Sequence, residues 1–99
     1  MSNFDNGLDK AQTERLVLLM EECGEVIQAC SKILRHGYKS ESPNGGRVNL
    51  EQLEKEISDM MWVVQLMLTN KDLRPAVIEK ESRATSITKP LYLHHQGSK

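Results

Sequence analysis

Apolar residues recur every three or four positions through most of this sequence, which is the spacing of one face of an α-helix. No stretch shows the strict alternation of apolar and polar residues that is typical of a half-buried strand. The pattern therefore predicts an all-α protein. In the first long helix the expected core stripe is Leu16, Leu19, Cys23, Val26, Cys30, Ile33 and Leu34.

The limits of the first helix are indicated by residues that favour helix ends. Asp9 and Gln12 have the spacing of a capping box, so the helix is expected to begin next to Asp9. Gly37 suits the left-handed position that follows many helices, and it sets the expected end. These signals predict one helix of more than 25 residues, with residues 1–8 as an N-terminal arm.

A loop is expected over residues 38–49, because Pro43, Asn44, Gly45 and Gly46 all favour turns. Asn49 is the predicted N-cap of a second helix, with Gln52 at its third position, and the helix should extend to about Thr69. Its expected apolar residues are Leu53, Ile57, Met60, Met61, Val64, Met67 and Leu68.

A shorter third helix is predicted over residues 74–85, where Pro75 is tolerated in the first turn, and residues 90–99 are expected to form a tail. The 99 residues allow a single domain with a modest core. Two long antiparallel helices and a short one cannot close a four-helix bundle alone. We therefore expect the bundle core to be completed by dimerisation.

Composition excludes several classes of partner. Thirteen Lys and Arg against fourteen Asp and Glu give a net charge of −1, which offers no general attraction to nucleic acid. No apolar run approaches the length that spans a bilayer, and no secretory signal is evident at the N-terminus. We expect a soluble, cytoplasmic protein with no nucleic-acid or membrane partner. Cys23 and Cys30 are expected to be buried, reduced thiols.

The acidic residues carry the candidate chemistry. On the first helix Glu22 and Glu25 share a line with Leu18 and Ala29, and on the second helix a matching line contains Glu56, Asp59, Val63 and Leu66. Lys and Arg are absent between Arg15 and Lys32 and between Lys55 and Lys71. An exposed acidic face would usually have basic residues one turn away. Carboxylates among apolar residues need a compensating cation, and a bound metal ion would supply it.

The donor atoms indicate which metal would bind. Carboxylate oxygens without His or Cys favour Mg²⁺, with Mn²⁺ as a substitute, over zinc. A di-iron site would need a His three residues after a helix glutamate, and neither helix has one. The sequence therefore predicts a hard-cation site, which could accept a polyphosphate together with its metal ions.

The segments "EECGE" (21–25) and "EISD" (56–59) resemble the motif of the MazG-like nucleotide pyrophosphohydrolases, E-E-x-x-E followed by E-x-x-D. The resemblance extends over residues 16–68, and the spacer between the two motifs is somewhat long for the family. The segment 15–38 looks most like small, phage-encoded members of the family. It implies an all-α dimer or tetramer that hydrolyses nucleoside triphosphates, usually deoxynucleotides, to the monophosphate and pyrophosphate with Mg²⁺. A phage protein would act in the host cytoplasm.

The resemblance also implies roles for individual residues. Four match the metal ligands of the family: Glu22, Glu25, Glu56 and Asp59. Glu21 matches the first acid and would hold a second metal or orient the attacking water, so Glu21 and Glu22 are the expected catalytic residues. Lys80 matches a phosphate-binding lysine of the third helix, and Arg83 shares its face, but Ala84 is nearest to the position where the family often has asparagine.

Trp62 follows Asp59 by one helical turn, where it could stack on a base, although a core position is the alternative. The hypothesis of a triphosphate pyrophosphohydrolase competes with two others. One is a non-catalytic helical dimerisation or interaction module, in which the acids only aid solubility. The other keeps the enzyme class and changes the substrate to dUTP or phosphoribosyl-ATP.

Overall fold

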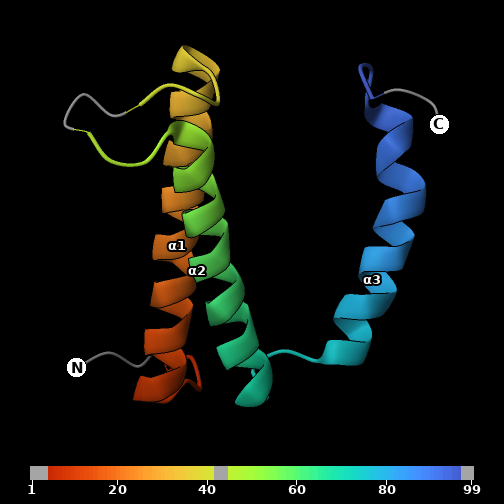
Figure 1. The fold of residues 1–99 in the computed structure, drawn as a ribbon. Helices are drawn as coiled ribbons and strands as arrows, with labels where there is room; N and C mark the ends of the chain where they lie inside the picture. The colour runs from red at the N-terminus through yellow and green to blue at the C-terminus, as the bar shows by residue number, and fades with distance from the viewer. Residues whose placement is uncertain (1–4, 42–44, 97–99) are drawn as a thin grey trace.

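The computed structural model describes residues 5–41 and 45–96, which form helices and turns without a β-strand. The elements are α1 (Lys10–His36), α2 (Asn49–Thr69), α3 (Pro75–Thr88) and the short 3-10 helix η1 (Lys89–Tyr92). Helices α1 and α2 lie side by side as an antiparallel hairpin, whereas α3 stands apart from both (Figure 1). The all-α prediction, with two long helices and one shorter helix, is confirmed for these residues.

The predicted ends of α1 are confirmed. The Asp9 carboxylate accepts a hydrogen bond from the Gln12 backbone at 2.7 Å, and the Gln12 side chain accepts one from the Asp9 backbone at 2.9 Å. These two bonds make the capping box. At the other end Gly37 has a φ of 86°, a conformation that disfavours residues with a Cβ atom.

The start of α2 differs by one residue from the prediction that Asn49 caps it. The N-cap is Val48, whose backbone N–H donates to the Glu51 carboxylate at 3.2 Å. The Asn49 amide instead donates to the Gly37 carbonyl at 3.0 Å, so it joins the end of α1 to the start of α2. Asn49 is therefore used for closing the hairpin, and that requirement overrides its preference for the capping position.

Helix α3 runs three residues beyond its predicted end, and Pro90 lies inside η1. A proline is accommodated there because the first residues of a helix have no internal partner for their N–H groups. The predicted tail thus begins with a helical turn. Parts of the predicted arm, loop and tail, including Pro43 and Asn44, lie outside the described residues.

The core of the hairpin is small. Three side chains of the hairpin are at most 5% exposed: Ala29 of α1, and Val63 and Met67 of α2. Six of the fourteen predicted stripe residues are exposed instead, so these expected core positions are wrong for the single chain: Leu16, Cys23, Cys30, Leu34, Ile57 and Met61. Both thiols are free, as predicted, but they are not buried. The apolar face of each long helix is wider than the other helix of the hairpin can cover.

An ion pair fixes the open end of the hairpin. Arg15 of α1 binds both carboxylate oxygens of Asp72, in the turn after α2, at 2.5 and 3.0 Å. Beyond this turn, α3 has no buried residue and continues directly into η1, without extensive packing on α1 or α2. Across the described residues, no helix combines the length and the apolar character needed to cross a membrane.

Candidate metal centre

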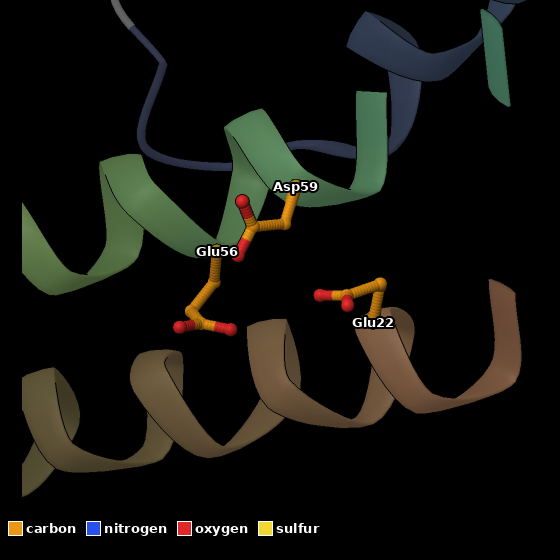
Figure 2. A group of neighbouring side chains, drawn as sticks. All are labelled: Glu22, Glu56 and Asp59. Carbon is orange, nitrogen blue, oxygen red and sulfur yellow. The ribbon is translucent and has the colours of Figure 1, made fainter. Parts of the chain in front are cut away.

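Three acidic side chains converge between α1 and α2. Glu22 extends from α1 towards Glu56 and Asp59 of α2 (Figure 2), and one carboxylate oxygen of each lies within 4.8 Å of the others. The local cause is the i, i+3 spacing of the two acids on α2, which places both on one side of the helix. The antiparallel hairpin then brings Glu22 opposite them.

Burial makes this arrangement costly without a further partner. Glu56 is only 8% exposed, and its Oε1 accepts a hydrogen bond from the Gln52 amide at 2.6 Å. The other oxygen, Oε2, is buried without a partner among the described residues, and so is Oε2 of Glu22. A buried charged oxygen that lacks a hydrogen bond destabilises the fold by several kcal/mol, roughly, unless a cation neutralises it.

One cation of the chain does contact the cluster. The Lys55 ammonium lies 2.5 Å from Oδ2 of Asp59, one turn away on the same helix. This hydrogen bond raises the pKa of Lys55 above its ordinary value. Both side chains of the pair are partly exposed, so the pair does not reach the buried oxygens of Glu22 and Glu56. One positive charge thus faces three carboxylates.

Glu25, the fourth predicted ligand, borders the cluster without joining it. Its side chain is exposed, yet hydrogen bonding with Glu56, followed by repulsion from Glu56 and Glu22, raises the pKa of Glu25 to about 7. The neighbouring acids therefore disfavour the ionised form of Glu25 in the metal-free protein. Of the four predicted ligands, the structure brings three together and places the fourth at their edge.

The remaining predicted site residues lie elsewhere in the single chain. Glu21 is exposed and outside the cluster, and Trp62 is 60% exposed, so the alternative of a core Trp62 is wrong here. Lys80 and Arg83 are exposed on α3, which does not pack against the acid-bearing helices. Arg83 pairs with Glu79 of its own helix at 2.7 Å.

A cavity beside the cluster contains residues that the sequence did not single out. It has a volume of about 560 Å³ and lies between α1, the start of α2 and residues 45–47. Glu25 and Glu56 form one part of its wall, and Lys32 and Arg47 belong to the rest. One signal was available, an arginine directly after two turn-forming glycines, but no spacing rule predicts that this arginine lines the same cavity as Lys32.

The donor set of the cluster fits a hard divalent cation. All three converging groups are carboxylates, which suit Mg²⁺ or Mn²⁺ better than zinc or copper. Three acids would leave further coordination positions for water and for phosphate oxygens. Comparisons of the chain with protein-family models, with curated proteins and with solved structures found no match.

Proposed function

We propose that this protein is a Mg²⁺-dependent nucleoside triphosphate pyrophosphohydrolase that converts a nucleotide, usually a dNTP, to the monophosphate and pyrophosphate in the cytoplasm. The observation that carries the proposal is the pair of buried, unpartnered carboxylate oxygens of Glu22 and Glu56, which face each other from two helices. A divalent cation between them would compensate both. Mn²⁺ could substitute for Mg²⁺.

The resemblance to the MazG-like motif supports the same residues. Glu22, Glu56 and Asp59 would hold the metal, with Glu25 at its edge. Bound Mg²⁺ would supply positive charge to the phosphate oxygens and lower the pKa of a coordinated water. The chain itself orients the three carboxylates, since Gln52 fixes Glu56 and Lys55 holds Asp59. Glu21 would act from the neighbouring face of α1, about 100° round the helix from Glu22.

We further propose that the active form is a homo-oligomer, either a dimer or a tetramer. The chain exposes 8591 Å², whereas a folded monomer of 11.3 kDa exposes about 5,700 Å². Its radius of gyration is 17.6 Å, against about 13 Å for a compact domain of this length. A second copy would cover the excess surface.

The face that a second copy would cover is an apolar seam on α1. The separation between successive seam residues is alternately four and three positions, which is the spacing of a helix-packing seam. All six are exposed: Leu16, Met20, Cys23, Ile27, Cys30 and Leu34. Leu34 is 87% exposed and Met20 is 73% exposed. If α3 of the second copy packs near this seam, its Lys80 could reach a phosphate group of the substrate.

The enzymatic proposal is tested with a panel of dNTPs and NTPs in Mg²⁺, followed by chromatographic identification of the products. A monophosphate and pyrophosphate are expected, whereas a phosphatase would release orthophosphate. Glu56→Gln and Asp59→Asn should abolish turnover, and Glu54→Gln, an exposed change on the same helix, should retain it. Full turnover in folded Glu56→Gln and Asp59→Asn variants would contradict the site.

The exposed seam and the unpartnered α3 also favour the second candidate, a non-catalytic helical interaction module. The two candidates differ in their response to metal. A metal-binding enzyme should gain thermal stability from Mg²⁺, and more from Mg²⁺ with a nonhydrolysable nucleotide, because ligands that bind only the folded state stabilise it. An unchanged melting temperature in both conditions would favour the interaction module.

A further inference from the structure

The cavity beside the metal centre is lined by both acidic and basic side chains. Its acidic residues are Glu25 and Glu56, and Glu56 also belongs to the acidic cluster. Lys32 of α1 and Arg47 of the segment before α2 add two positive charges to its lining. Its volume of about 560 Å³ lies within the range of small-ligand sites.

The two cations are available for a ligand. Neither Lys32 nor Arg47 forms an ion pair with another described residue, although the cavity they line also contains acidic side chains. The charge of Arg47 also reaches Lys55, where it opposes the rise of the Lys55 pKa.

A second observation points to a ligand at Glu56. This residue lines the cavity, is more than nine-tenths buried and has an oxygen without a hydrogen-bond partner among the described residues. A cation at this carboxylate and an anion at Lys32 and Arg47 would compensate the acidic and the basic side chains together. A diphosphate group chelated to a divalent cation has this combination of charges.

We propose that the cavity is the diphosphate subsite, in which Lys32 and Arg47 bind the β- and γ-phosphates of the triphosphate. This inference rests on the proposed function. Gly45 and Gly46, with φ of 78° and 104°, make the turn that brings Arg47 to the wall. Guanidinium and ammonium groups bind phosphate oxygens through charge-assisted hydrogen bonds.

This assignment fixes the direction of the substrate. Water attacks the α-phosphorus and the bond from that atom to the bridging oxygen breaks. The electron pair stays on the departing pyrophosphate, and the proton of the water goes to solvent. The pyrophosphate remains in the cavity at the N-terminal end of α2. The nucleoside then lies farther along α2, where the exposed Trp62 follows Asp59 by one turn.

The test measures binding rather than turnover. The affinity of inorganic pyrophosphate in Mg²⁺ is determined by calorimetry for the wild type, Lys32→Gln, Arg47→Gln and the double variant. Each single change should weaken binding about tenfold and the double change about a hundredfold, as expected for charge-assisted hydrogen bonds. Two matched controls, Arg35→Gln and Lys39→Gln, remove exposed charges outside the cavity and should stay within about twofold of the wild type.

Two further ligands test the proposed orientation of the triphosphate. A nucleoside monophosphate should bind all variants equally, because its phosphate occupies the α-position. A nonhydrolysable triphosphate should lose affinity in parallel with pyrophosphate. If only free pyrophosphate loses affinity, the cavity is a separate pyrophosphate site and the assignment is overturned.

Failure of the inference is distinguishable from failure of the enzyme proposal. Wild-type pyrophosphate affinity in the folded double variant, or no pyrophosphate binding by the wild type, overturns the subsite even if triphosphates are hydrolysed. Parallel loss of affinity for pyrophosphate and for the nonhydrolysable triphosphate supports the subsite even if no triphosphate in the panel is turned over. Circular dichroism and melting temperature confirm that each variant is folded.

Discussion

Glu56 is a buried carboxylate whose charge the chain compensates with one hydrogen bond, from Gln52. Glu56→Gln should therefore stabilise the metal-free protein by about 1–3 kcal/mol, because it removes a charged oxygen that has no partner. The same change should abolish the rise of melting temperature in Mg²⁺. Both effects are measured by thermal unfolding in EDTA and in Mg²⁺, with Glu54→Gln as the control. A destabilised variant that keeps its metal response would contradict the site.

The raised pKa of Glu25 makes stability depend on pH. The folded-state pKa of about 7 exceeds the ordinary value of 4.5, so between these values the folded protein binds more protons than the unfolded chain. Stability of the metal-free protein should then fall as pH rises from 4.5 to about 7 and level off above it. Thermal unfolding in EDTA from pH 5 to 8 measures this fall, which Glu25→Gln should reduce.

Metal binding should show the opposite trend. A cation at the cluster favours the deprotonated carboxylates, so Mg²⁺ should release protons below neutral pH and bind more tightly as pH rises towards 7. Calorimetry at pH 6 in buffers of different ionisation enthalpy counts the protons released. Equal stabilisation by Mg²⁺ at pH 6 and pH 8 would contradict the coupling between Glu25 and the cluster.

At this scale the sequence identified the acids and missed the cations. Glu56 and Asp59 share a helix face by spacing alone. The burial expected from the scarcity of basic residues is found for Glu56, whereas Asp59 is partly exposed and pairs with Lys55. Lys32 and Arg47 come together only when the hairpin closes and the segment after Gly45 and Gly46 turns back. No periodicity in the sequence predicts that these two residues line one cavity, so only the three-dimensional structure could show it.

At the scale of elements, the pair of Arg15 and Asp72 ties α1 to the turn that precedes α3. Hydrogen bonding between them raises the pKa of Arg15 and lowers that of Asp72. Asp72→Asn should lower the melting temperature more than Glu79→Gln, which breaks an exposed pair within α3. Similar melting temperatures for the two variants would contradict a structural role for this pair.

The stabilisation by this pair should also fade in acid. Because the folded pKa of Asp72 lies below its ordinary value of 3.8, the contribution is complete above that value and is lost as pH falls through the folded value. Acid unfolding of the wild type and Asp72→Asn should therefore converge at low pH. A difference in stability that persists there would require another explanation.

Helix ends were predictable where local hydrogen bonds decide them. The capping box of Asp9 and Gln12 involves only neighbours in sequence, and it is present as expected. Asn49 was misplaced by one residue because its amide bonds to Gly37, twelve residues away. Pro90 did not end the helical region, because η1 accepts a proline near its start.

At the scale of the whole molecule, the apolar stripe predicted for α1 is divided in the structure. Leu19, Val26 and Ile33 are partly covered, whereas its other four residues are exposed and belong to the seam, together with Met20 and Ile27, which were not predicted. Both sets of residues follow the same helical periodicity. The pattern therefore does not distinguish residues that pack within the chain from residues that pack against a second copy. This is why Leu16 and Leu34 were assigned to the core of the single chain.

A charge placed on the seam should disrupt the oligomer. Ile27 is 68% exposed and central in the seam, so Ile27→Glu should shift the protein to monomers, measured by light scattering after size exclusion. Gln65→Glu places the same charge at an exposed polar position of α2 and should leave the mass unchanged. Wild-type oligomers in Ile27→Glu would contradict the proposed interface.

The isolation of α3 from its own hairpin has a consequence for how the protein behaves on dilution. If neighbouring copies supply most of the contacts of α3, then folding and association form one equilibrium, and the melting temperature should rise with protein concentration. Specific activity should then decline as enzyme is diluted towards the dissociation constant. The amount of protein that a cell makes would then set the fraction of molecules that are folded and active, as well as their number.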